Sequence, residues 1–178
     1  MSGSTPTWEL ALPDDGDTNW GDAYRDAMLT VDERLGGLRG SLFVEDNATA
    51  TLIAAVNTPV QAALGNVQSG PFCRFCEING AGVITYVGPL DRVPTVQAAF
   101  TLQSEGANKT ARVEVRLNGV AVPGSAKRVR FGPNVTVQSG ALVANVEIAN
   151  GDELSVWVAN LTDDTNLTVT DLTLAARG

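Results

Sequence analysis

The hydrophobic positions of this 178-residue chain change their spacing near residue 40. Before that point apolar residues recur every third or fourth position, and after it they mostly alternate with polar ones. The first spacing is typical of an amphipathic helix, and the second is typical of β-strands with one buried face. The pattern therefore predicts a short N-terminal helix followed by a much larger all-β body.

The helical pattern covers residues 19–40. It begins after Asp17 and Thr18, whose side chains can cap a helix together with Asn19, and a Gly-Gly pair at 36–37 favours a stop. Two interpretations stay open: the helix forms a seam between three copies of the chain, or it packs on its own β-domain. The second stays open because fewer than three heptads cannot hold a coiled coil together unaided. The apolar positions with coiled-coil spacing, the candidate trimer seam, are Tyr24, Met28, Val31, Leu35 and Leu38.

Residues 1–18 are rich in Ser, Thr, Gly and Pro, and three apolar side chains, Trp8, Leu10 and Leu12, alternate along them. Such a segment has no core of its own, so exposed apolar residues favour docking on another protein. With Trp20, they are the candidate attachment residues. The alternative is a tail that folds back on its own body.

The sequence around the helix start also has the ligand spacing of a calcium loop, with Asp15, Asp17, Asn19 and Asp26 at suitable positions. Trp20 occupies the sixth place of that loop, where a glycine is expected. We therefore interpret the segment as a helix cap, and expect no metal ion and no cofactor.

From residue 41 to 178 the pattern predicts short strands at regular spacing with no intervening helix. An Asn-Gly pair at 118–119 and another at 150–151 predict tight turns between strands. This is typical of an antiparallel β-sandwich. The predicted strands fall within residues 48–56, 78–86, 96–102, 111–117, 134–137, 142–148, 154–158 and 167–174.

Three segments, 57–60, 84–92 and 150–160, together with the order of strands and turns, resemble the tumour-necrosis-factor-like jelly rolls of phage fibres, spikes and head decorations. The resemblance covers about residues 48–176, and residues 16–21 resemble the N-terminal portion of phage fibre proteins. It implies a homotrimer around a threefold axis, with strand faces buried between subunits. It also implies a structural or adhesive module and not an enzyme.

Composition excludes some partners. The net charge is −8 and the twelve basic residues are scattered, which argues against nucleic acid. The nearest approach to a basic cluster is Lys127, Arg128 and Arg130, which alternation on a strand would split between two faces. No apolar run reaches the ~20 residues of a membrane helix, and the N-terminal residues lack a basic segment followed by an apolar one, so we expect no classical export signal.

Histidine is absent, which excludes Ser-His-Asp triads and His-containing metal sites. Phosphate loops and nucleophile elbows are also absent from the sequence. We expect no enzymatic activity. A remote alternative is a carbohydrate-active enzyme that uses a pair of carboxylates.

Cys73 and Cys76 could supply two of the four ligands of a zinc ion, but the sequence has no second pair of ligands. A thioredoxin-type redox motif needs a neighbouring helix between strands, and the pattern predicts none. The pattern favours two free thiols packed as small apolar side chains. Asn-x-Thr sequons could mark a glycoprotein, but turn asparagines beside strand threonines explain them as well. They begin at Asn47, Asn108, Asn134, Asn160 and Asn166.

These features together predict a virion structural protein with three parts. Residues 1–18 form a docking arm, 19–40 a trimerising helix and linker, and 41–178 the jelly-roll domain. The expected protein is a trimeric capsid decoration (cement) protein or short head fibre, assembled in the host cytoplasm and displayed on the virion surface. Its expected partners are itself and the major capsid protein or another virion protein. The alternative is a receptor-binding tail fibre or adhesin that binds a host glycan or protein.

Overall fold

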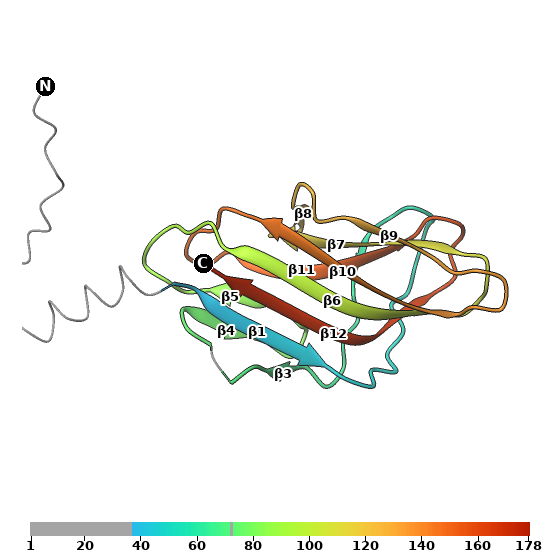
Figure 1. Ribbon diagram of the computed structural model, residues 1–178, viewed down its shortest axis with the longest axis horizontal. Coiled ribbons are helices and arrows are strands. Elements are labelled where there is room, and N and C mark those ends of the chain that lie inside the picture. Colours follow the sequence, from blue (N-terminus) through green and yellow to red (C-terminus); the bar gives the residue numbers. More distant parts are fainter. Residues whose placement is uncertain (1–36, 72) are drawn as a thin grey trace, which may run out of the picture. The chain divides into compact units, whose positions relative to one another are not determined.

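Two antiparallel β-sheets stack face to face in the computed structural model, which describes residues 37–71 and 73–178 (Figure 1). Residues 38–178 form one compact unit. The predicted docking arm and all but the last positions of the predicted helix lie outside the described residues.

The first sheet contains the longest strands and has the order β10-β6-β12-β1-β3. All its pairings are antiparallel, and β1 lies against β12 from Arg39↔Arg177 to Val44↔Leu172. Its strands are β1 (Arg39–Val44), β3 (Gln68–Ser69), β6 (Thr95–Ser104), β10 (Val137–Asn145) and β12 (Leu167–Arg177).

The second sheet has the order β4-β5-β11-β7-β8, and two short strands extend it: β2 pairs with β11, and β9 pairs with β7. The turn between β7 and β8 is the predicted Asn118-Gly119 turn, with both residues at positive φ. Its strands are β2 (Val60–Gln61), β4 (Cys76–Ile78), β5 (Ile84–Tyr86), β7 (Thr110–Leu117), β8 (Val120–Ala121), β9 (Lys127–Arg130) and β11 (Glu153–Asn160).

The strand order is that of a jelly roll. The first main strand, β1, pairs with the last, β12, while β5 pairs with β11 in the other sheet. Further in, β6 lies between β10 and β12, and β7 lies between β9 and β11. Successive strands thus wrap around both sheets as two Greek keys do. The predicted antiparallel sandwich is confirmed.

Period-two alternation builds the core, as the sequence predicts. In β6 the buried side chains are Val96, Ala98, Phe100 and Leu102, and each fully buried Leu or Phe contributes about 2 kcal/mol. In β12 the register shifts between Val169 and Asp171. This bulge lets buried residues three apart in sequence face the core on both sides of it.

Two of the predicted strands are wrong. Residues 48–56 contain a single bridge, between Thr51 and Leu167 at the start of β12, and beside it the segment bonds to loop side chains and not to a strand. For example, Ile53 N donates to Asn166 Oδ1. Pro133 and Asn134 form a turn with Asn134 at φ +63°, and β10 begins only at Val137.

The cysteine interpretation is also wrong. Cys73 and Cys76 form a disulfide, with their Cα atoms 5.6 Å apart. A straight strand would point residues three apart to opposite faces, but Phe75 lies between them at φ +55° and turns the chain. The disulfide closes this turn at the start of β4, whose first residue is Cys76.

Candidate assembly face and loop end

The structure describes one of the candidate site residues from the sequence. Leu38 is 1% exposed and belongs to the hydrophobic core of the sandwich, so the structure places it inside the β-domain and not on a helical seam. The other candidates for attachment, trimerisation and metal binding lie outside the described residues.

The outer face of the first sheet is broad and uncharged at its centre. Along three rows of the sheet, Gln97 pairs with Val143 and Ala175, and Ala99 pairs with Ala141 and Thr173, while Thr101 pairs with Ser139 and Asp171. We call the central positions the assembly face: Ser41, Phe43, Gln97, Ala99, Thr101, Ser139, Ala141, Val143, Thr173 and Ala175.

The assembly face has room for a close neighbour. A shallow depression of about 360 Å³ lies on it, lined by neutral residues such as Phe43, Ala99 and Thr173 and, toward one end of the face, by Glu45 and Asp171. Val143, at the edge of the face, is 59% exposed. Small side chains let another backbone approach closely, and an uncharged surface loses little hydration free energy when it is covered. The face can therefore bury against a flat partner surface.

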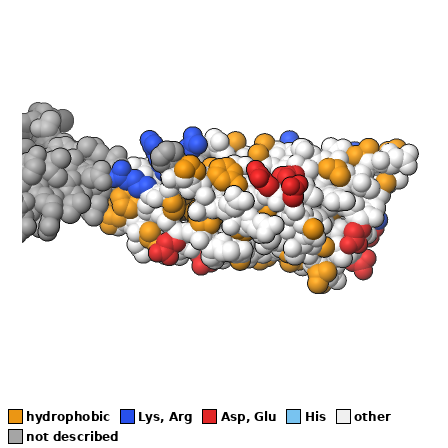
Figure 2. Space-filling model, turned by 90° about the horizontal axis from the view of Figure 1, so that it is seen from below, with side chains coloured by type: hydrophobic (Ala, Val, Ile, Leu, Met, Phe, Trp, Pro, Cys, Tyr) orange, Lys and Arg blue, Asp and Glu red, His pale blue; other side chains and the backbone are white. Residues whose placement is uncertain are grey.

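The side of the sandwich near β3 differs from the assembly face in its charges (Figure 2). There, hydrophobic side chains are dispersed among neutral and charged ones, and Lys and Arg side chains gather toward the end where the described chain begins. This side therefore carries charged side chains along its length, unlike the centre of the assembly face.

Loops gather at the end of the sandwich opposite residue 38. The chain enters β1 beside Arg177, so the loops that follow β1, β6, β9 and β11 meet at the other end. Asn57 N donates to the Asn160 carbonyl there, and Phe131 N donates to the Lys109 carbonyl. We call this group of loops the loop end.

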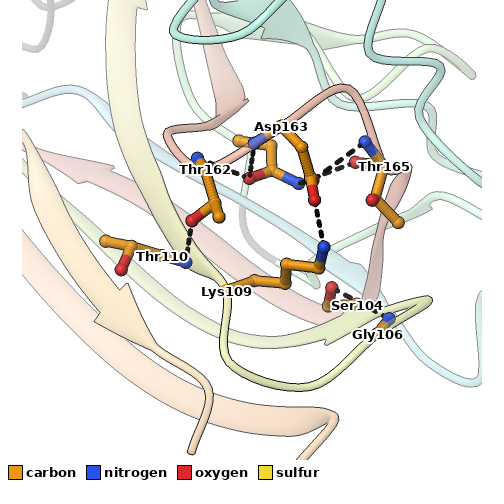
Figure 3. Close-up of polar contacts among 8 residues, drawn as sticks. Ser104, Gly106, Lys109, Thr110, Thr162, Asp163 and Thr165 are labelled. Carbon is orange, nitrogen blue, oxygen red and sulfur yellow. Dashed lines mark hydrogen bonds and ion pairs between the residues drawn. The ribbon is translucent and has the colours of Figure 1, made fainter.

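A polar network holds the loop end together (Figure 3). Lys109 donates to the carboxylate of Asp163, and the Thr110 backbone donates to Thr162 Oγ1 over 2.9 Å. Asn160, fully buried, donates from Nδ2 to Asp163 Oδ1 and to the Thr165 carbonyl, each over 2.9 Å. Two loops that are far apart in sequence are therefore joined.

The electrostatics of Asp163 follow from this network. The hydrogen bond from Lys109, and then one from Thr165, lower the pKa of Asp163 from 3.8 to about 2. The carboxylate is therefore ionised over the whole physiological pH range, and it acts as a fixed acceptor and not as a general acid near neutral pH.

Asn47 and, as described above, Asn160 are sequon asparagines with structural roles. Asn47 is 3% exposed, and its amide donates to the Val169 carbonyl at 2.8 Å and to the Ala63 carbonyl at 3.0 Å. Asn47 Oδ1 accepts from Thr49 N and Gly65 N, each at 3.0 Å. An asparagine with both ends bonded inside the fold offers no acceptor nitrogen for a glycan.

A charge ladder runs along the outer face of the second sheet. Glu114, 3% exposed, lies between Arg112 and Arg116 on β7. Its carboxylate accepts from Arg116 Nε at 2.8 Å, and Arg112 Nε forms an ion pair with it at 3.1 Å without hydrogen-bond alignment. The Arg116 guanidinium also stacks on Trp157, 4.4 Å from the ring centroid. The alternating pattern of residues 111–117 could have predicted that these three charged side chains share one face, because they are two residues apart in the sequence.

No cluster of three or more metal-ligating side chains is present in residues 37–71 and 73–178. In the same part of the chain, no helix has the length and apolar character needed to cross a membrane.

The strand order defines a jelly-roll β-sandwich. Solved structures with a similar arrangement include the PRD1 vertex protein P5, at 13% identity and a TM-score of 0.49 over 78% of this chain and 71% of that one. Others are murine APRIL, at 12% identity and 0.46 over 78% and 98%, and the Eiger TNF of S. frugiperda, at 9% and 0.42 over 78% and 91%. No family model and no curated protein matches the sequence.

Proposed function

We propose that this protein is a virion structural protein: a homotrimer that decorates the capsid or forms a short head fibre. It attaches through its N-terminal residues and displays the β-sandwich outward. It works by assembly and not by catalysis. The major capsid protein or another virion protein is its partner.

The observation that carries the proposal is the assembly face. The chain has a net charge of −8, yet the centre of the first sheet's outer face contains no charged side chain. The charges lie at its two ends, with Arg39 and Arg177 at one and Glu45 and Asp171 at the other. A subunit contact would cover the neutral centre and leave the charged ends in water.

A receptor-binding fibre is the second candidate function, and the ordered loop end favours it. Loops fixed by the Lys109–Asp163 contact form a rigid surface at the end away from residue 38. Binding residues on loops that a rigid scaffold positions are common. Copy number separates the two candidates: many copies over the capsid support decoration, and a few trimers at the tail support receptor binding.

A truncation tests the proposal. Deleting residues 1–20 should release the protein from purified particles, while native mass measurement still finds three truncated chains together, each lighter than the 18.6 kDa of the full-length chain. Retention of the truncated protein on particles would contradict attachment through the N-terminus. A full-length monomer would contradict the trimer.

A further inference from the structure

Two arginines lie exposed on the edge strand β9. Arg128 and Arg130 are exposed on β9, and among the described residues neither makes an ion pair or a side-chain hydrogen bond. Val129 between them is 6% exposed and faces the core, so both arginines point outward. The sequence prediction that strand alternation splits the three basic residues is confirmed: Lys127 lies on the side of Val129, and Arg128 and Arg130 share the other side.

The cross-strand register adds to the positive charge. Arg128 lies opposite Arg112, and Arg130 lies opposite Thr110. The outer face of β7 and β9 carries four arginines, Arg116 among them, and one carboxylate, that of Glu114. Positive charges therefore outnumber negative ones on this face. Like charges this close repel one another, and an anion placed among them would lower the free energy.

A depression beside the arginines has the lining of a sugar site. It has a volume of about 400 Å³, which suits one or two sugar rings. Thr110, Thr162 and Asn57 offer polar groups, and Leu161 offers an apolar surface. Thr162 Oγ1 already accepts from the Thr110 backbone, so its hydroxyl hydrogen is free to donate.

We propose that this depression binds the carboxylate of an acidic sugar in a glycan or polysaccharide. The guanidinium group of an arginine binds a carboxylate through two parallel hydrogen bonds. In this depression the threonine and asparagine side chains bind the hydroxyl groups of the sugar ring. A long nucleic acid fits less well, because the rest of this acidic protein repels it. The site lies on the second sheet at the loop end, so it stays open when the assembly face is covered.

Binding of a uronic-acid oligosaccharide to the full-length protein tests the inference. Isothermal titration at low salt with oligogalacturonate should show binding that the matching neutral oligosaccharide lacks. The double variant Arg128→Gln/Arg130→Gln should bind at least about tenfold more weakly. The matched control Arg39→Gln/Arg177→Gln removes the same charge at the opposite end of the sandwich and should bind as the wild type does.

Three outcomes would overturn the inference. The first is the absence of binding at sugar concentrations up to about 10 mM, because a dissociation constant above that value is too weak for a useful glycan contact. The second is an equal loss of affinity in the control variant, which would mean unspecific attraction. The third is tighter binding of a DNA oligonucleotide than of the acidic sugar at the same salt concentration. Trimer mass and particle attachment are measured separately, so failure here leaves the proposed function untouched.

Discussion

Lys109 in the loop after β6 donates to the carboxylate of Asp163 in the loop after β11, and this contact joins positions 54 residues apart. The two loops belong to different connections between the sheets, so the contact also fixes one end of the sandwich. Thr165 N adds a second hydrogen bond to the same carboxylate, at 3.1 Å.

Asp163→Asn should destabilise the protein in a pH-dependent way. The pKa of Asp163 falls from 3.8 to about 2 on folding, so its ionised form stabilises the folded state above about pH 4. That stabilisation is lost as the pH falls through 2. We expect about 1 kcal/mol, less than the shift alone implies, since the side chain is 34% exposed and water screens the pair.

Urea unfolding of wild type and Asp163→Asn between pH 2 and 7 measures this difference. Asp164→Asn, in the same loop without a side-chain contact in the described part of the chain, is the control and should change stability little. A wild-type advantage that is constant down to pH 2 would contradict the assignment.

Glu114→Gln should lower the free energy of unfolding by about 3 kcal/mol at pH 7, because two arginines lose a buried counter-charge. Chemical denaturation measures the change. Glu153→Gln removes an exposed carboxylate on the neighbouring strand β11 and should cost less than about 0.5 kcal/mol. Equal effects of both changes would show that the ladder does not stabilise the sheet.

Asn47→Ala should cost about 3 kcal/mol, since it leaves the carbonyls of Ala63 and Val169 and two backbone N–H groups without their partner. Thermal unfolding checks it. The control is Asn145→Ala, whose side chain makes an exposed contact with Thr95 and should matter little. A drop smaller than that of the control would mean that water replaces the amide.

Ala99→Arg should break the proposed trimer, because it places a charge at the centre of the assembly face. Native mass measurement should then find single chains with an unchanged β-sheet circular dichroism spectrum. Ala121→Arg puts the same charge on exposed β8 of the other sheet and should leave the trimer intact. A trimeric Ala99→Arg variant would move the interface elsewhere.

The fold class follows from local sequence features. Alternation in 96–102 and 111–117, and the Asn-Gly turn between β7 and β8, are confirmed because both depend on residues close in sequence. The segment 48–56 has the same β-branched composition but no neighbouring strand to pair with along its length. Composition alone cannot distinguish these cases, since pairing depends on the whole sheet.

The sequence by itself determined that this chain forms an antiparallel sandwich, because the period of its apolar residues sets which side chains share a face. Only the tertiary structure decided which distant residues meet. It brings Arg128 beside Arg112 and Lys109 beside Asp163, and it buries Leu38 in the sandwich. Cross-strand register is fixed by packing across the whole core, and no local pattern in the sequence records it.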